Sequence, residues 1–239
     1  MVLFRTIWMF VNAIIATALI AILIVLTALL LKNQTLITGL LRLWGSWVIK
    51  AVGIKVKLHG LENVDPNMQY VILGNHESVL DIFLVFSKIP LPFRIVAKAE
   101  LRKIPLVGIA MERGLFPLID RKNRLSAIKA LNGTFDKMKK NQLSVLIFPE
   151  GTFSENGRLI PFKKGSFVLA IDNKLPILPV VICGAGKINP PGTIWIKDSE
   201  IDMYFLPPIA ASEVKNANRT KLRDQVFRTM DDFQRERCC

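Results

Sequence analysis

The sequence predicts an α/β protein, in which a mostly parallel or mixed sheet is covered by helices and preceded by a membrane-anchoring helical segment. Short apolar runs alternate with longer amphipathic stretches through the middle of the 239-residue chain, as strands alternate with crossover helices. Ahead of them lies one apolar run that is too long for a strand. We expect an anchor with an interfacial helix over residues 1–53, an α/β domain over 54–211 and a C-terminal amphipathic helix over 212–239.

The first element is the apolar run of residues 7–31, which contains 25 residues and no charge. At ~1.5 Å per helical residue it is long enough to cross a hydrocarbon core of roughly 30 Å. The alternative is a cleaved signal peptide, whose apolar region is shorter, about 7–15 residues, and ends in small residues. This run ends in LTALLLK. Positive charge is lighter before it (Arg5) than after it (Lys32, Arg42, Lys50), which favours the cytoplasmic face of the inner membrane for the rest of the chain.

Residues 36–53 form the second predicted helix, with apolar residues at helical spacing and Arg42 and Lys50 on the other side. Trp44 and Trp47, flanked by cations, suit a helix lying at the level of the lipid headgroups. An amphipathic helix packed on the protein itself explains the pattern equally well.

The domain follows as alternating strands and helices. The final stretch, 212–235, places Leu222, Val226, Met230 and Phe233 at helical spacing and reads as an amphipathic helix docked on the domain. The predicted strands are 54–58, 70–74, 93–97, 115–119, 144–148, 177–183, 193–197 and 202–206, and the predicted helices are 79–88, 105–112, 124–140 and 164–172.

The net charge of +13 is concentrated in the middle of the chain, where residues 98–164 hold 14 Lys and Arg against 6 Asp and Glu. A basic face beside a membrane anchor attracts anionic lipid, an anionic substrate or an acidic carrier protein. Nucleic acid is not the expected partner, because zinc-finger spacing, a basic helix with heptads and aromatic RNA-binding signatures are all missing from the sequence.

The three cysteines show neither metal-binding nor redox spacing. Cys183 lies in an apolar run and is expected to be a buried core residue. No metal site is predicted, because the chain has only two histidines, His59 and His76, far apart in sequence.

The segment GNHESVLD places His76 in a polar break after the apolar run of residues 70–73, with Asp81 five residues later. Ligand-binding side chains gather at the carboxyl ends of strands in α/β folds. A histidine held by a carboxylate can act as a general base near neutral pH. A structural histidine is the alternative that this pair leaves open on its own.

A second polar cluster follows the strand predicted at 144–148, in the sequence FPEGT. Glu150 with the amides around Gly151 suits the binding of a hydroxyl, although an ordinary turn with a solvated carboxylate fits as well. Lys163 and Lys164 precede an apolar helix, where a phosphate can bind near a helix N-terminus. Arg121 follows another predicted strand and has the guanidinium geometry that matches a phosphate.

Together these segments resemble the glycerolipid acyltransferase family. GNHESVLD resembles the family's N-H-x-S-x-x-D block, FPEGT its second strong block, VAKAELRKIPLVG (96–108) the segment between them, and PILPVVI (176–182) its final block. Within that family, the chain is most similar to bacterial 1-acyl-sn-glycerol-3-phosphate acyltransferases. The match covers about residues 70–182 and has the family's order and spacing.

The resemblance implies transfer of a fatty acyl group from a thioester to the 2-hydroxyl of lysophosphatidate, giving phosphatidate for phospholipid synthesis. It implies no cofactor beyond the donor substrate, acyl-CoA or acyl carrier protein, and membrane lipid as the setting. His76 would take the hydroxyl proton and Asp81 would orient it. The other implied site residues bind the glycerol (Glu150), bind the phosphate (Arg121, Lys163 and Lys164) or shape the site (Asn75, Ser78, Gly151 and Thr152).

Two departures from the family pattern concern the acceptor's phosphate. Phe153 stands where the family commonly has an arginine after E-G-T, and Gly114 precedes Arg121 by seven residues instead of six. One alternative is therefore an acyltransferase with another lysophospholipid or a lyso-aminolipid as acceptor. A non-catalytic protein that binds anionic lipid or acyl carrier protein is another. A hydrolase is a third, although the sequence has no G-x-S-x-G nucleophile elbow.

Overall fold

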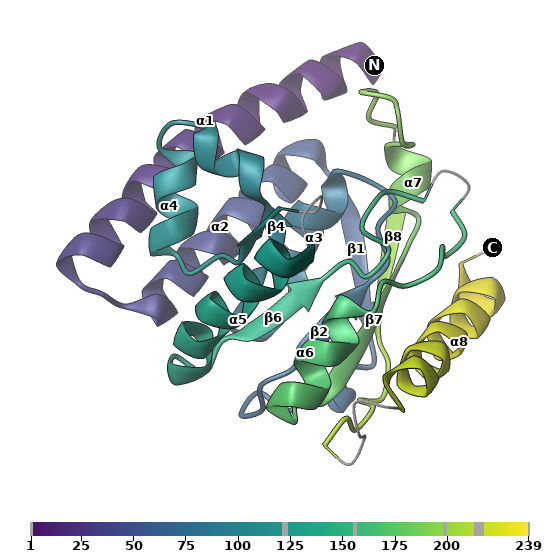
Figure 1. The fold of residues 1–239 in the computed structure, drawn as a ribbon. Helices are drawn as coiled ribbons and strands as arrows, with labels where there is room; N and C mark the ends of the chain where they lie inside the picture. The colour runs from purple at the N-terminus through teal and green to yellow at the C-terminus, as the bar shows by residue number, and fades with distance from the viewer. Residues whose placement is uncertain (1, 121–123, 155–156, 198–199, 213–217, 239) are drawn as a thin grey trace. The chain divides into compact units, whose positions relative to one another are not determined.

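The computed structural model describes the whole chain except residues 1, 121–123, 155–156, 198–199, 213–217 and 239 (Figure 1). Its helices and strands divide into two compact units that alternate along the sequence. The first unit contains Met1–Thr6, Ile54–Asp81 and Leu146–Cys239, and the second contains Ile7–Gly53 and Ile82–Val145. The chain passes between the units at four points: inside helix α1 (Val2–Leu30), after Gly53, inside helix α3 (Leu80–Lys88) and inside strand β6 (Ser144–Ile147).

Four strands of the first unit form a mixed sheet. They lie in the order β1-β8-β7-β2, with the bounds β1 (Lys55–His59), β2 (Val71–Gly74), β7 (Ile177–Cys183) and β8 (Glu200–Phe205). β1 is parallel to β8 and β2 is parallel to β7, whereas β7 and β8 are antiparallel. Every residue of β2 and β7 is buried, which is why both are continuous apolar runs rather than alternating ones. The predicted mixed α/β fold is confirmed.

Helices cover this sheet. The first unit contains η1 (Leu61–Asn63), α6 (Gly165–Asn173), α7 (Ala185–Ile188) and α8 (Arg219–Arg237). α8 packs against β7 and α6, and α6 packs against β2 (Figure 1). The buried residues of α8 recur every four positions, as a helix with one covered face requires: Leu222, Val226, Met230 and Gln234. Gln234 is the polar member of this row, and its amide reaches the candidate site described below.

The part of α1 from Ile7 onward belongs to the second unit, where it is followed by α2 (Gln34–Val52). The side chain of Asn33 accepts a hydrogen bond from the Leu36 N–H and caps α2, and Gly53 ends it in the left-handed conformation with φ 70°. The Trp44 indole donates to Thr17 Oγ1 at 3.0 Å and the Trp47 indole to Asn12 Oδ1 at 3.1 Å. Both indoles are thus bonded to α1, and the headgroup-level position of α2 stays a prediction.

The rest of the second unit is built around a buried arginine. Arg94 donates to Thr38 Oγ1, to Gln34 Oε1 and to the Gly114 carbonyl, and its burial lowers the pKa of the guanidinium to about 9. These bonds join α2 to β3 (Phe93–Ile95) and to the turn after α4 (Val107–Arg113). The unit's other elements are β3 (Phe93–Ile95), β4 (Ala97–Lys98), η2 (Ala99–Lys103), α4 (Val107–Arg113), β5 (Leu118–Ile119) and α5 (Arg124–Lys140).

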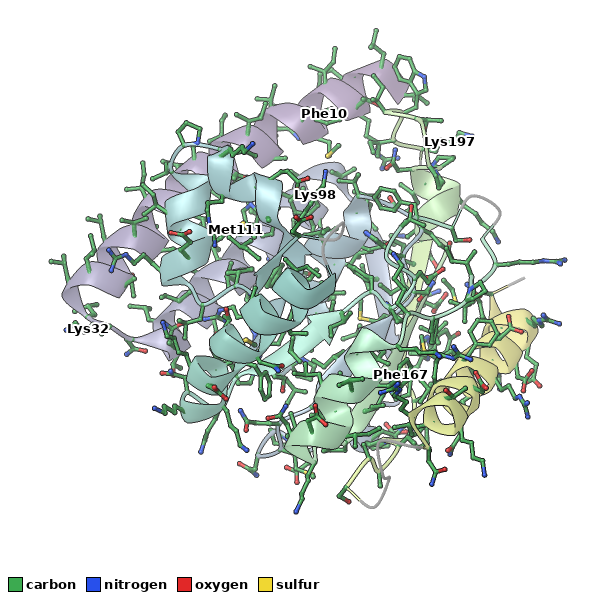
Figure 2. The ribbon with its side chains drawn as sticks, in the orientation of Figure 1. Phe10, Lys32, Lys98, Met111, Phe167 and Lys197 are labelled. Atoms are coloured by element: carbon green, nitrogen blue, oxygen red, sulfur yellow. A yellow bond between two sulfur atoms is a disulfide. The ribbon has the colours of Figure 1, made fainter. Side chains whose placement is uncertain are left out.

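The exposed side of α1 is apolar. Phe10 is 42% exposed, and large hydrophobic side chains are exposed along the helix from Val2 to Leu30 (Figure 2). Among the described residues, α1 is the one helix that is long and apolar enough to cross a membrane. An apolar surface of this length favours lipid over water as its neighbour, which is consistent with membrane association.

The sequence prediction of a strand at residues 193–197 is wrong. Residues 193–197 do not form a strand, because local bonds take their backbone groups: the Asn189 amide donates to the carbonyls of Thr193 and Trp195, and the Lys197 N–H donates to the Ile188 carbonyl. Cys183 is buried, as predicted, and the structure adds a disulfide between it and Cys238, 55 residues later. The division at residues 53 and 211 stays a prediction.

Candidate active site

The site is built at the carboxyl end of β2, where the chain leaves the sheet and enters helix α3. Residues 75–79 make this turn, which we call the catalytic loop together with Asp81 in the first turn of α3. The Ser78 hydroxyl accepts the Leu80 N–H at 3.1 Å, so a serine cap begins the helix at this point. Ser78 and Asp81 are both buried, and the loop is therefore held as part of the interior.

Asp81 organises the loop through one oxygen. Its Oδ2 accepts the His76 Nδ1–H at 2.9 Å and the N–H groups of Glu77 and Ser78 at 2.8 and 2.9 Å. The side chain is 1% exposed, and that of His76 is 14% exposed. A carboxylate that accepts several N–H groups is held in position. With Nδ1 as the donor to Asp81, Nε2 is the nitrogen left to accept a proton.

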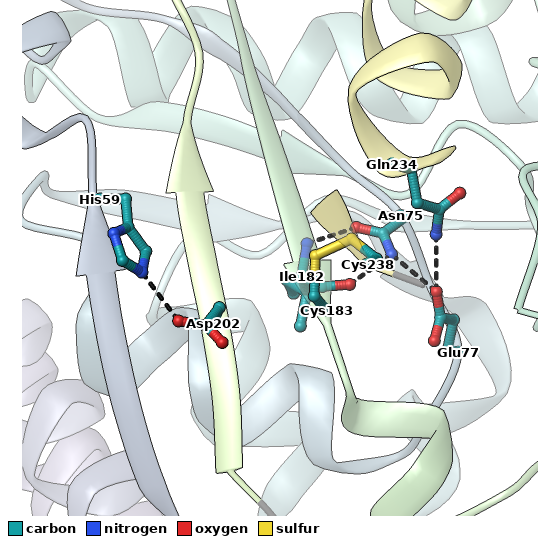
Figure 3. The surroundings of a disulfide bond; sticks show 8 residues. All are labelled: His59, Asn75, Glu77, Ile182, Cys183, Asp202, Gln234 and Cys238. Carbon is teal, nitrogen blue, oxygen red and sulfur yellow. Dashed lines mark hydrogen bonds and ion pairs between the residues drawn. A yellow bond between two sulfur atoms is a disulfide. The ribbon is translucent and has the colours of Figure 1, made fainter. Parts of the chain in front are cut away.

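Asn75 ties the catalytic loop to the neighbouring strand. Its amide donates to the Ile182 carbonyl at 2.8 Å and its oxygen accepts the Ile182 N–H at 2.7 Å, so the side chain continues the β2–β7 ladder beyond β2 (Figure 3). On the other side, the Ser78 hydroxyl donates to Asn189 Oδ1 at 3.1 Å. These bonds fix both ends of the loop that carries His76.

The FPEGT segment and the residues after it are hydrogen-bonded to the His76 backbone. Glu150 Oε1 accepts the His76 N–H at 2.9 Å, and Glu150 Oε2 accepts the Ile160 N–H at 3.1 Å. The Ser154 N–H donates to the His76 carbonyl at 2.9 Å. Glu150 is 2% exposed and both of its oxygens are bonded to backbone amides, so this geometry suits the positioning of His76 better than the glycerol contact expected from the sequence.

Two aromatic rings border the imidazole. Phe148 stacks on His76 with centroids 3.9 Å apart and planes 4° apart, and Phe153 lies at 4.3 Å with a tilt of 48°. Phe148 ends the run from β6, and Phe153 is the residue that departs from the family pattern. The two rings exclude water from much of the imidazole and restrict its rotation.

Glu77, the residue after His76, connects the loop to the C-terminal helix. Its Oε1 accepts the Asn75 amide at 3.0 Å and the Gln234 amide at 2.8 Å (Figure 3). Gln234 lies on the buried row of α8, and Cys238 at the end of α8 is joined to Cys183 at the end of β7. α8 is therefore fastened beside the catalytic loop by one hydrogen bond and one covalent bond.

Burial sets the charge of two carboxyl groups in this cluster. It raises the pKa of Glu77 to about 7, with the nearby Asp81 charge adding to the effect and the Asn75, Gly186 and Gln234 bonds opposing it. Burial also raises the pKa of Glu150 to about 7, against the hydrogen bonds from Ile160 and His76. An imidazolium at His76 would thus be surrounded by groups that carry or can acquire negative charge.

The remaining residues predicted from the sequence lie around this cluster or outside the described residues. Gly151 follows Glu150 with φ 75°, and the Lys163 side chain packs over it, so a β-carbon at Gly151 would strike that side chain. Thr152 and Lys164 are exposed, and Lys164 lies at the start of α6. Arg121 lies outside the residues that the structure describes.

Sequence reasoning did not find Glu77, Phe148, Ser154, Asn189 or Gln234. Glu77 lies directly after the candidate catalytic histidine, and this position is the sequence signal that could have found it. The bonding partners Asn189 and Gln234 follow only from the fold, because they lie more than 100 residues away in the chain.

A family model described as "Acyltransferase" matches residues 55–183, which is more than half of the chain. The chain belongs to this acyltransferase family. The family's match includes both the catalytic loop and the FPEGT segment, which the geometry above brings together.

Relatives of this acyltransferase are named 1-acyl-sn-glycerol-3-phosphate acyltransferase. One from Limnanthes douglasii is 36% identical over 165 residues, covering 69% of this chain and 58% of the relative. One from Saccharomyces cerevisiae is 32% identical over 188 residues, covering 76% and 62%. The match thus spans about three fifths of these relatives' length. A crystal structure of the 1-acyl-sn-glycerophosphate acyltransferase PlsC from Thermotoga maritima has the same fold, with a TM-score of 0.83, 23% identity, and coverage of 98% of this chain and 95% of that one.

Proposed function

We propose that this protein transfers a fatty acyl group from an acyl thioester to the 2-hydroxyl of lysophosphatidate and forms phosphatidate. One observation carries the proposal: His76 Nδ1 is bound to the buried Asp81, in a loop fixed at both ends, within a family of acyltransferases. The names of the relatives support lysophosphatidate as the acceptor.

The reaction follows from which imidazole nitrogen is available. His76 Nε2 takes the proton of the acceptor hydroxyl while the hydroxyl oxygen attacks the thioester carbonyl. Asp81 stabilises the imidazolium that forms. Collapse of the tetrahedral intermediate breaks the carbon–sulfur bond, and the imidazolium returns the proton to the leaving thiolate. The products are the ester and a free thiol, and no acyl-enzyme is formed.

The other residues position the base or bind the substrates. Glu150 holds the His76 backbone, while Asn75 and Ser78 fix the ends of the catalytic loop. Gly151 and Thr152 shape the turn beside the loop. Lys163, Lys164 and Arg121 are proposed to attract the acceptor's phosphate.

The membrane is the setting in which such substrates are found. Lysolipids and their diacyl products partition into bilayers, and the apolar face of α1 would keep the site at that surface. The donor is acyl-CoA or acyl carrier protein, since both are anionic and the chain is basic. The charges around α1 favour a catalytic domain on the cytoplasmic face of the inner membrane. The Cys183–Cys238 disulfide opposes this orientation, because the cytosol keeps most thiols reduced.

A second acceptor is favoured by one specific observation. Phe153 contacts His76 at the position where the family commonly carries an arginine. An aromatic ring there removes one cation from the surroundings of the base, which suits another lysophospholipid or a lyso-aminolipid as the acceptor.

The test is acyl transfer by the purified full chain in detergent or vesicles, with lysophosphatidate beside other lysolipids and with both donors. We expect phosphatidate from the wild type, and a loss of about 10²- to 10⁴-fold in the His76→Ala variant. His59→Ala is the matched control, because it removes a histidine from the same unit and should leave the rate unchanged.

The other outcomes separate the candidates. If product forms only from a different lysolipid, that lysolipid is the acceptor, and the proposed acyl-transfer reaction still holds. Transfer that survives in His76→Ala would contradict the proposed base. Lipid or carrier binding without turnover by any donor and acceptor pair would identify a binding protein instead of an enzyme.

A further inference from the structure

A cavity of about 500 Å³ lies beside the catalytic loop in the first unit. Glu77 lines it on the loop's side, and two basic residues, Arg158 and Lys187, line it from other segments. Lys163 and Lys164, the described cations predicted from the sequence, are not among its lining residues. The remaining lining residues are Ser154, Gly157, Gly184, Gly186, Pro190, Pro191 and Cys238.

Arg158 belongs to a segment that is bonded directly to His76. The Ser154 N–H donates to the His76 carbonyl at 2.9 Å, and the Ser154 hydroxyl donates to the Arg158 carbonyl. Ser154 is itself buried. Ser154 therefore links the backbone of the candidate base, His76, to the backbone of Arg158.

Lys187 belongs to a second segment that is bonded to the same loop. The Gly186 N–H donates to the Glu77 carboxylate, and Asn189 Oδ1 accepts the Ser78 hydroxyl at 3.1 Å. Lys187 lies between these two contacts, in α7. Both cations are thus carried by segments whose positions are set by residues 76–78.

We propose, given the acyl transfer proposed above, that Arg158 and Lys187 bind a phosphate group of one of the two substrates in this cavity. The geometry of guanidinium matches a phosphate in two parallel hydrogen bonds, and a lysine adds a second positive charge. The cavity has room for a phosphate and the atoms attached to it.

Glu77 is the one acidic residue among the cavity's described lining, and burial raises its pKa to about 7. The described lining therefore contains two cationic residues and, at neutral pH, a carboxyl group that is partly protonated.

The phosphate has two possible sources, the lysophosphatidate headgroup and the coenzyme A part of the donor. Steady-state kinetics on Arg158→Gln and Lys187→Gln distinguishes them. We expect the KM of the substrate that carries the phosphate to rise about 10- to 100-fold in Arg158→Gln, with kcat within threefold of the wild type. A rise for lysophosphatidate alone assigns the cavity to the acceptor, and a rise for acyl-CoA alone assigns it to the donor.

Three controls accompany this measurement. Lys221→Gln removes an exposed cation of α8 that does not line the cavity, and should change neither KM. Arg158→Lys keeps the charge and should recover part of the affinity. Thermal unfolding of each variant checks that the fold is intact.

Equilibrium binding keeps the proposal testable if no transfer is found. Lysophosphatidate in vesicles and free coenzyme A are titrated into His76→Ala protein with and without Arg158→Gln. Weaker binding of either in the double variant supports the cavity even when the proposed reaction fails. Unchanged binding and unchanged KM values in Arg158→Gln and Lys187→Gln would overturn the proposal, whether or not the protein is an acyltransferase.

Discussion

The chain's two histidines have nearly the same neighbours and very different settings. His76 pairs with Asp81 at 2.9 Å and stacks on Phe148, and His59 pairs with Asp202 at 2.7 Å and stacks on Tyr204 (Figure 3 shows the second pair). Both therefore have a carboxylate on one ring nitrogen and an aromatic ring on one face. A list of contacts alone would make each a candidate base.

Burial and backbone bonding separate them. The His59 and Asp202 side chains are 42% and 34% exposed and face each other across two paired strands, so water and salt weaken the pair. Asp81 is 1% exposed and its Oδ2 also accepts two backbone N–H groups of the catalytic loop. An aspartate held in this way fixes both the orientation and the tautomer of His76, whereas Asp202 is free of such constraint within its strand. The hydrogen bonds within the catalytic loop, more than the histidine–aspartate pair itself, therefore distinguish His76 as the candidate base.

Replacing each aspartate by asparagine should give the largest difference in kcat between the two histidine sites. In Asp81→Asn the new amide can donate to Nδ1, which moves the ring proton to Nε2 and removes the base. We expect kcat to fall by about 10²- to 10⁴-fold. Asp202→Asn should leave kcat within twofold. Steady-state rates at saturating substrate measure both, with thermal unfolding as the fold control, and similar rates for the two variants would refute the special role of the loop.

The sequence was sufficient to locate His76 and Asp81, because both lie within one turn between a strand and a helix. The apolar run at 177–183 also predicted β7 residue for residue. Local pattern works here because the whole strand is buried and needs no long-range information to be recognised.

Contacts made by distant or irregular segments could not be predicted in the same way. The role of Glu150 depends on the Ile160 N–H, which lies in a stretch without regular structure. The Cys183–Cys238 bond depends on where α8 ends, and 55 intervening residues give no spacing signal. The apolar run at 193–197 resembled a strand, but bonds from Asn189 and to Ile188 satisfy its backbone.

One glutamate near each histidine, Glu77 near His76 and Glu200 near His59, gives a second test, which uses the pH dependence of the protein's stability. Burial raises the pKa of Glu77 from 4.5 to about 7, so its contribution is complete below pH 4.5 and is lost as the pH rises through 7. Glu77→Gln should therefore reduce the loss of stability between pH 5 and pH 8, by on the order of 3 kcal/mol at most. Thermal unfolding at both pH values measures this.

Glu200, two residues before Asp202, is the matched control. Its hydrogen bond and ion pair with Lys57 lower the pKa of the exposed carboxyl group, so its contribution is present above pH 4.5 and is lost as the pH falls. Glu200→Gln should thus change stability in the opposite direction and only slightly. A wild-type unfolding temperature that depends on pH as strongly as that of Glu77→Gln would show that Glu77 has no raised pKa.

The aromatic rings allow the finest comparison and the smallest effect. Phe148 and Tyr204 are both half-buried and each stacks on one histidine, a contact worth about 0.5–1.5 kcal/mol. If the ring of Phe148 keeps His76 aligned for proton transfer, Phe148→Leu should lower kcat by about 2- to 10-fold without a matching change in KM, since one kcal/mol is about fivefold in rate. Tyr204→Leu should change the unfolding temperature alone, because no reacting atom depends on the orientation of His59. Equal effects of the two variants on kcat would mean that the stacking contributes to folding and has no part in setting the base.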